Sequence, residues 1–163
     1  MVDDIFEVRE IQAKDTYLLR EKVLGWMENY NCLSLPEDAA PTTHHLGCFS
    51  CQSQSDEPIG VLTVLHHQID VSDKRIDDDL VLGYAWQIRG MAVDDAYRGQ
   101  HVGSRLIAAL VDMKELRQSS YRLWANVRIA AVEFYRKNGF AIVGDPFLVK
   151  SVGDHYLMVQ SEC

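Results

Sequence analysis

The sequence contains no apolar stretch long enough to cross a membrane. None of its runs approaches the roughly 18 uninterrupted apolar residues of a membrane helix. It begins MVDDIFEVRE, which is acidic where a signal peptide would be basic and then apolar. It also has few cysteines for its 163 residues, namely Cys32, Cys48, Cys51 and Cys163. We therefore expect a soluble, cytoplasmic protein with reduced thiols and no membrane partner.

A zinc site is not expected either, although HHLGCFSC (residues 44–51) holds four potential ligands, His44, His45, Cys48 and Cys51. The segment alternates like a strand, in which residues three apart face opposite sides. Cys48 and Cys51 could then share one ion only across a turn. Because no second CxxC pair follows, we interpret these four as ordinary strand residues and predict no metal.

The net charge of −8 argues against nucleic acid as a partner, but the charge is unevenly spread. Residues 84–140 carry nine Lys or Arg against five acids, a balance of +4 that leaves −12 for the rest. A locally basic segment in an acidic chain favours a site for a small anion.

Hydrophobic patterning predicts one domain over residues 1–163, in the order β-α-β-β-β-α-β-α-β-β. The first helix starts near Asp15, and we expect it to bury an apolar stripe: Leu18, Leu19, Val23, Trp26 and Met27. A later helix carries the stripe Val102, Leu106, Ile107, Leu110 and Val111, and another spans 129–138 and ends at Gly139. Strands are expected at 5–11, 44–50, 59–67, 80–93, 121–126, 140–145 and 155–159, with a solvated acidic connection at 70–79. This is an α/β fold in which about four helices cover both faces of a mixed sheet of six to seven strands.

The stretch AYRGQHVGSRL (residues 96–106) lies between an expected strand and an expected helix. Such a turn aims free backbone N–H groups, and the positive end of the helix dipole, at one point that attracts phosphate. The spacing and lysine of a P-loop are missing, and so is the GxGxxG dinucleotide fingerprint, because the turn has only Gly99 and Gly103.

Together, RGMAVDDAYRGQHVGSRLI and ANVRIAAVEFYRKNGF resemble the GNAT acetyltransferase superfamily. The first matches its pyrophosphate loop, which follows a strand ending in a motif like MAV. The second resembles its strand and helix that carry a Phe-Tyr pair before Gly-Phe. The two motifs have the family's order and cover roughly residues 85–142. The resemblance implies the GNAT acyl-CoA acyltransferase fold and acetyl-CoA as co-substrate.

By this resemblance, coenzyme A would contact the end of the strand, the loop and the next strand. The implied cofactor-binding residues are Met91, Ala92, Val93, Arg98, Gly99, Gln100, His101, Val102, Gly103, Ser104, Asn126 and Arg128. The Met91 amide would polarise the thioester carbonyl. His101 replaces a third glycine, but it still supplies an amide. If its φ is positive, histidine is among the less penalised non-glycine residues, and its imidazole would lie near phosphate.

Tyr135 matches the family's general acid, which protonates the departing thiolate; the alternative is a core aromatic that only packs. Two positions depart from the family pattern. Gln87 stands where protein-lysine acetyltransferases have a glutamate base, and Arg128 replaces a frequent asparagine. The base is therefore open: an ordered water, or His45, His66 or His67.

The sequence thus indicates a GNAT N-acetyltransferase that transfers acetyl to a primary amine of a small molecule or peptide. A longer acyl group remains an alternative, as does a non-catalytic coenzyme A or acyl-CoA sensor. A homodimer stays open. The motifs do not identify the acceptor.

Overall fold

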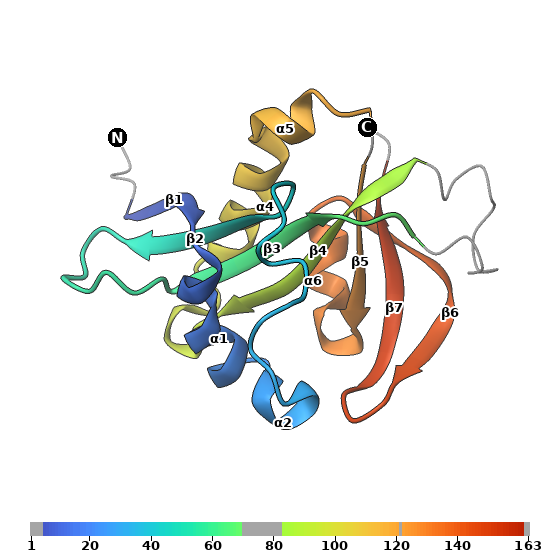
Figure 1. Cartoon of the computed structure of the whole chain (residues 1–163), viewed down its shortest axis with the longest axis horizontal. Helices are drawn as coiled ribbons and strands as arrows, with labels where there is room; N and C mark the ends of the chain where they lie inside the picture. The colour runs from blue at the N-terminus through green and yellow to red at the C-terminus, as the bar shows by residue number, and fades with distance from the viewer. Residues whose placement is uncertain (1–4, 70–82, 121, 162–163) are drawn as a thin grey trace. The chain divides into compact units, whose positions relative to one another are not determined.

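The computed structural model describes residues 5–69, 83–120 and 122–161 (Figure 1). Its seven strands have the sheet order β1-β2-β3-β4-β5-β7-β6. The strands are β1 (Phe6–Ile11), β2 (His44–Ser50), β3 (Gly60–His66), β4 (Tyr84–Val93), β5 (Arg122–Arg128), β6 (Phe140–Val149) and β7 (Gly153–Gln160). The α-helices described are α1 (Tyr17–Lys22), α2 (Trp26–Tyr30), α4 (Val102–Asp112), α5 (Lys114–Arg117) and α6 (Val132–Lys137). Short 3₁₀ helices lie at Ala13–Thr16, Asp95–Tyr97 and Ile129–Ala131. The predicted fold class, a mixed sheet with flanking helices, is confirmed.

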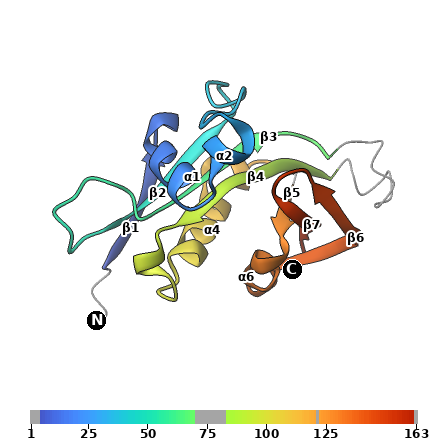
Figure 2. The same ribbon diagram turned by 90° about the horizontal axis from the view of Figure 1, so that it is seen from below.

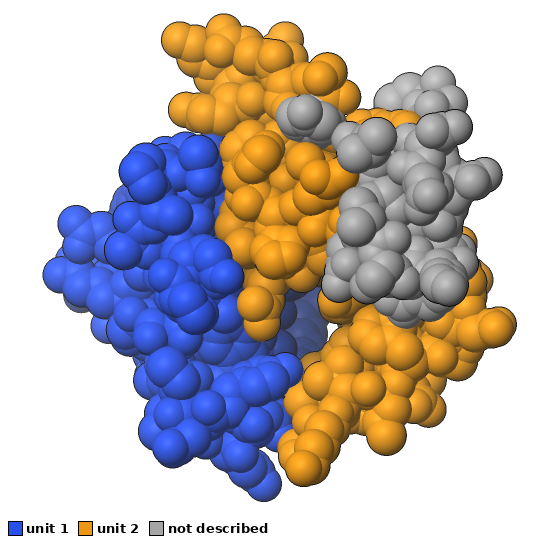
Figure 3. All heavy atoms as spheres, turned by 45° about the vertical axis from the view of Figure 1, so that its right-hand side comes forward, with its two compact units in different colours: residues 1–64, 90–113 blue, residues 65–89, 114–163 orange. Residues whose placement is uncertain are grey.

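The chain forms two compact units (Figure 3). Unit 1 comprises residues 1–64 and 90–113, and unit 2 comprises residues 65–89 and 114–163. The loop 98–104 belongs to unit 1 and Tyr135 to unit 2.

In unit 1, helices cover both faces of an antiparallel meander (Figure 2). Successive side chains of a strand face opposite sides, and the start of β3 shows this clearly. A Cβ built on Gly60 would lie 2.6 Å from Val102 of α4, whereas Val61 packs with Leu19 of α1 and with Ala92. Gly60 thus lets α4 approach the sheet closely, and burial of Val61 holds α1 on the other face.

Unit 2 combines one parallel and two antiparallel pairings. The first half of β4 runs parallel to β5, with Gln87 opposite Trp124, and β7 pairs antiparallel with both β5 and β6. Its core cluster consists of Ile69, Tyr84, Trp124, Leu157 and Val159. The helical segment that follows β5 ends as predicted, at a left-handed Gly139 with φ of 88°.

The first helical segment differs from its prediction, because it is broken rather than continuous. Gly25 is left-handed, with φ of 62°, and this resets the helical phase between α1 and α2. Leu18 and Met27 are consequently 56% and 44% exposed, and only part of the predicted stripe is buried. On α4, Val111 is 42% exposed because the buried stripe ends at Leu110.

The predicted acidic connection (70–79) lies outside the described residues, as do the first three residues of the strand expected at 80–93. Within the described ranges, no helix combines the length and apolar character required to cross a membrane.

Candidate functional site

The end of β4 leads into the loop through a set of local contacts made by Asp94. The Asp94 amide donates to the Ile59 carbonyl at 2.8 Å, and its carboxylate accepts from the Ala96 amide at 3.0 Å. Lys22 of α1 donates to the same carboxylate at 2.8 Å, which lowers the pKa of Asp94. These contacts fix the chain directly after Met91–Val93, of which Ala92 is buried.

The loop itself has two left-handed residues. Gly99 has φ of 76° with open space around its Cα, and His101 has φ of 64° and ψ of 21°. The positive φ considered for His101 is therefore present. Its exposed imidazole does not cap α4. Arg98 and Gln100 are exposed as well, and Arg98 forms an ion pair with Asp95 at 2.8 Å.

Helix α4 begins directly after this turn, without a side-chain cap. The first N–H groups of an α-helix have no acceptor within the helix, so residues 102–104 direct theirs away from it. Val102 and Gly103 are buried and Ser104 is half-buried. These free amides at the start of a helix, which we call the cradle, form a geometry that could bind a small anion, and their role stays a prediction.

Tyr135 lies on α6 and is 6% exposed. Its ring meets Phe134 and Phe140 edge-on, with centroids 5.3 Å apart in both cases. Its hydroxyl forms no hydrogen bond with any part of the chain that the structure describes. Burial raises the pKa of the phenol, which therefore stays protonated at neutral pH.

The other predicted residues of unit 2 lie on β4 and β5. Asn126 and Arg128, two residues apart, share one face of β5; Asn126 is exposed and Arg128 half-buried. Gln87, at the position of the family's glutamate base, is buried on β4. Neither strand places a carboxylate at these three positions.

The three histidines considered as bases have different environments. His66 and His67 are exposed, and His66 lies edge-on to Trp86 with centroids 5.0 Å apart. His45 is buried on β2, where both of its ring nitrogens have partners: Nδ1 lies 2.8 Å from Thr63 Oγ1 and Nε2 lies 3.2 Å from the Asp38 carbonyl oxygen. His45 therefore has no free nitrogen with which to accept a proton from an amine.

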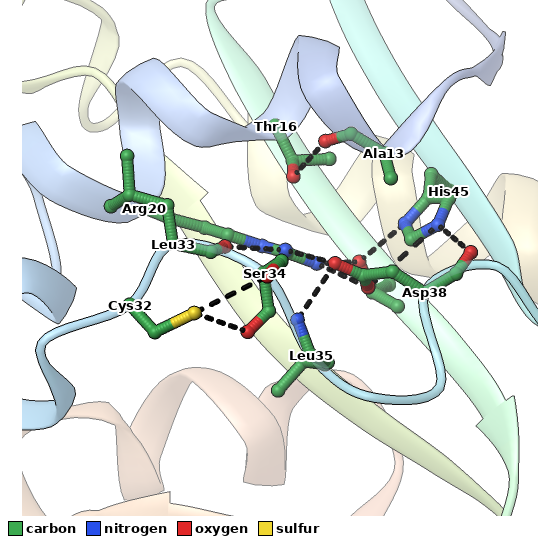
Figure 4. Close-up of polar contacts among 10 residues, drawn as sticks. Ala13, Thr16, Arg20, Cys32, Leu33, Ser34, Leu35, Asp38 and His45 are labelled. Carbon is green, nitrogen blue, oxygen red and sulfur yellow. Dashed lines mark hydrogen bonds and ion pairs between the residues drawn. The ribbon is translucent and has the colours of Figure 1, made fainter.

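His45 belongs to a buried polar cluster of four side chains, which we call the Arg20 cluster: Arg20, Asp38, His45 and Thr63 (Figure 4 labels the first three). Arg20 comes from α1 and is fully buried. Its Nη1 donates to Asp38 Oδ2 at 2.7 Å and to the Leu33 carbonyl at 2.8 Å. Its Nη2 donates to Asp38 Oδ1 at 3.1 Å and to Thr63 Oγ1 at 2.8 Å. The bidentate ion pair with Asp38, together with the two further acceptors, compensates most of the cost of burying the Arg20 charge.

The hydrogen bonds of the Arg20 cluster have a fixed direction. A guanidinium only donates, so the Thr63 oxygen accepts from Arg20 and its own proton is directed to His45 Nδ1. The Asp38 carbonyl only accepts, so His45 Nε2 carries the hydrogen. Burial lowers the pKa of His45, which agrees with this neutral tautomer. Burial alone would raise the pKa of Asp38, but hydrogen bonds from Arg20 and the Leu35 amide, with the Arg20 charge, lower it.

Sequence reasoning missed the Arg20 cluster. The one signal was that Arg20 lies on the buried helical face, four residues after Thr16 and three before Val23. Nothing in the sequence pairs it with Asp38, which lies 18 residues further along the chain.

The four potential zinc ligands of residues 44–51 are not gathered at one point. Cys48 is buried within β2, where burial raises the pKa of its thiol to about 11, while Cys51 follows the strand and is exposed. His44 contacts Glu10 and His45 belongs to the Arg20 cluster. Among the residues described, no group of three or more His, Cys, Asp and Glu could hold a metal ion.

Comparisons with known proteins agree with this geometry. A family model for the acetyltransferase (GNAT) domain matches residues 45–142. An uncharacterized N-acetyltransferase of Bacillus subtilis (strain 168), YitI, is 28% identical over 163 residues, which cover 96% of this chain and 97% of the relative. The crystal structure of Escherichia coli ElaA has a TM-score of 0.69 at 16% identity, over 96% of this chain and 99% of that one. Arabidopsis thaliana NAA60, solved in complex with acetyl-CoA, has a TM-score of 0.67 at 17% identity, over 94% and 97%.

Proposed function

Since the chain belongs to the GNAT acetyltransferase family and is an acyltransferase, we propose that it transfers acetyl from acetyl-CoA to a primary amine of a small molecule or peptide. The observation that carries this proposal is the turn from β4 into α4. Two left-handed residues, Gly99 and His101, precede a helix that begins without a side-chain cap. Backbone amides there suit the pyrophosphate of coenzyme A.

In this proposal the cofactor contacts Met91–Val93, the loop 98–104, Asn126 and Arg128. The Met91 N–H would donate to the thioester carbonyl oxygen, where negative charge develops in the transition state. NAA60 of Arabidopsis thaliana, a structural neighbour, was solved with acetyl-CoA, which supports a coenzyme A thioester as the co-substrate. The exposed imidazole of His101 would lie near the phosphates, and its backbone amide makes the proposed contact.

The proposed reaction forms one C–N bond and breaks one C–S bond. A neutral amine attacks the thioester carbonyl, its extra proton passes to water, and the tetrahedral intermediate expels the coenzyme A thiolate. Tyr135 gives that thiolate a proton and recovers one from solvent. The raised pKa of this phenol supports a donor that is fully protonated at neutral pH. Water is the base in this scheme because both nitrogens of His45 are engaged, and the exposed His66 and His67 are the alternatives.

Ligand-dependent heat stability tests the cradle. Coenzyme A and dephospho-coenzyme A should both raise the melting temperature, whereas pantetheine, which lacks the pyrophosphate, should raise it least. Gly103→Asp places a carboxylate at the helix N-terminus and should abolish most of the coenzyme A effect while the protein stays folded. Equal stabilisation by pantetheine would contradict the cradle.

Acetyl-CoA turnover against a panel of amines, followed as thiol release, tests the chemistry. Release that depends on the amine supports an N-acetyltransferase, and longer acyl-CoA donors define the acyl preference. The alternative is a coenzyme A sensor, which agrees with the lack of a carboxylate at residues 87, 126 and 128 and with the engaged nitrogens of His45. That alternative predicts coenzyme A binding with no turnover of any amine.

The remaining parts of the proposal concern domain organisation, location, partners and assembly. Residues 1–163 would act as one GNAT domain in the cytoplasm, with a small-molecule or peptide amine as partner and neither nucleic acid nor membrane. A homodimer is the assembly to test, and sedimentation equilibrium distinguishes it from a monomer.

A further inference from the structure

The Arg20 side chain contacts β4 as well as its own cluster. Among the described residues its Nε has no hydrogen-bond partner, although it is fully buried. A Cβ built on Gly90 would lie 3.3 Å from this Nε and 3.4 Å from two atoms of the Trp26 ring. The guanidinium also stacks on Trp26, with its central carbon 4.6 Å from the ring centroid. Arg20 and Trp26 therefore pack together against the backbone of Gly90.

Gly90 has an unusual conformation for the interior of a strand, with φ of 62°. A left-handed glycine is typical of a β-bulge, which disturbs the regular ladder and redirects the groups that follow. The next peptide N–H is that of Met91. The direction of the Met91 N–H thus depends on the turn at Gly90, and no side chain at Gly90 itself stabilises that turn.

We propose that Arg20 is a positioning residue for acyl transfer. Leu33, Asp38 and Thr63 hold its guanidinium through four hydrogen bonds. The fixed guanidinium and Trp26 then hold the left-handed turn at Gly90, and with it the direction of the Met91 N–H. This inference rests on the proposed function, in which that N–H donates to the thioester oxygen.

The alternative is that Arg20 only stabilises the fold by joining α1 to β3 and to residues 33–38. A purely structural role predicts that any substitution lowers stability and leaves the turnover of the folded fraction unchanged. A positioning role predicts a lower kcat in fully folded protein, together with a change at the Met91 amide. The two roles can therefore be distinguished by kcat and by the Met91 amide signal of folded protein, which do not depend on stability alone.

The test uses the full chain and two variants of the cluster. Arg20→Met combined with Asp38→Asn removes both charges together, so no carboxylate is left buried and unpaired, and the Asn oxygen can still accept from the Leu35 amide. Arg20→Lys keeps the charge but loses the planar fork. The matched control is Arg9→Met with Glu7→Gln, which removes an exposed Arg–Glu pair of the same unit.

Two readouts are compared at a temperature where each variant is folded. We expect kcat to fall by roughly tenfold or more in both cluster variants, as befits a misdirected oxyanion donor. KM for acetyl-CoA should stay within about threefold, because the loop 98–104 is untouched. With ¹⁵N-methionine labelling, the Met91 amide signal, assigned through Met91→Leu, should move by more than its line width. The signal of Met158, buried in β7, should not move. The control pair should change neither kcat nor the Met91 signal.

The kcat values and the Met91 signals of the variants decide whether Arg20 is a positioning residue. Unchanged kcat and an unmoved Met91 signal in folded cluster variants would overturn the positioning role, and so would equal losses of kcat and acetyl-CoA affinity. If neither cluster variant folds, Arg20 is a folding residue and the inference is wrong. A wild-type protein that turns over no amine, but whose Met91 signal still depends on Arg20, would overturn the proposed function and leave the link from Arg20 to Met91 standing.

Discussion

Tyr135→Phe should leave the fold intact, and the structure sets the size of its effect on stability. The substitution removes one oxygen from a ring that is 6% exposed and keeps both edge-on contacts with Phe134 and Phe140. Because the hydroxyl has no hydrogen bond to a described residue, no such bond is lost. The free energy of unfolding should therefore change by less than about 1 kcal/mol, in either direction.

The effect on rate should be much larger. If the phenol protonates the departing thiolate, kcat should fall by about 10²-fold or more, which corresponds to about 2.7 kcal/mol of transition-state stabilisation. KM for acetyl-CoA should hardly change. Because burial raises the pKa of Tyr135 above its ordinary 10.0, ionisation of this group should cause no loss of wild-type rate below about pH 10.

The assay is thiol release at saturating acetyl-CoA with an accepted amine, combined with urea unfolding. Tyr84→Phe is the matched control, since Tyr84 is also buried in unit 2 and, among the described residues, its hydroxyl makes only a long contact of 3.5 Å with the Gln160 carbonyl. It should keep both rate and stability. An unchanged kcat for Tyr135→Phe would refute the general-acid role, and a joint loss of affinity and stability would assign Tyr135 to packing.

Three further predictions concern the loop, the buried cluster and the sheet. His101→Gly should keep coenzyme A affinity within about threefold and stability within about 1 kcal/mol, because a left-handed backbone suits glycine and the amide is retained; a large loss of affinity in calorimetry would instead show that the imidazole binds. As the pH falls below 6.5, the unfolded chain protonates His45 before the folded protein does, so stability should drop by at most about 1.4 kcal/mol per pH unit. Because the pKa of Asp38 is also lowered, stability should fall further below pH 3.8. In urea unfolding measured over a pH series, His45→Gln should flatten only the fall that begins at pH 6.5. An identical pH dependence in the variant would contradict the role given to His45. Gly60→Ala should lower the free energy of unfolding by about 1 to 3 kcal/mol, since its Cβ would lie 2.6 Å from Val102. Adding Val102→Ala should recover most of that loss. Full stability of Gly60→Ala alone would show that α4 moves away from the sheet to make room.

Local patterns predicted the sheet, the α4 stripe and the family. Val102, Leu106, Ile107 and Leu110 repeat at helical spacing along one uninterrupted helix, and the structure buries all four. Each of the two family motifs is also one continuous stretch of sequence. The family model that matches residues 45–142 confirms the resemblance that they carry. The roles of Tyr135 and of the loop residues stay predictions.

The features that the sequence did not predict depend on breaks in the backbone of a helix and on contacts between residues far apart in the chain. Apolar spacing predicted one long first helix, but the left-handed Gly25 divides it and exposes Leu18 and Met27. The other three members of the Arg20 cluster come from three later segments, so no local pattern links them to Arg20. For the same reason His45 could be considered as a base until its two nitrogens were seen to be engaged.

The direction of the hydrogen bonds around His45 limits how this position can diverge among related sequences. The residue must accept from Thr63 on one side and donate to the Asp38 carbonyl on the other. A neutral imidazole shares this property with a carboxamide, so histidine can be exchanged for glutamine or asparagine without disturbing its neighbours. A lysine only donates and an ionised glutamate only accepts, so either would require a change at residue 38 or 63 in the same lineage. Substitutions in the Arg20 cluster should therefore accumulate in concert rather than singly.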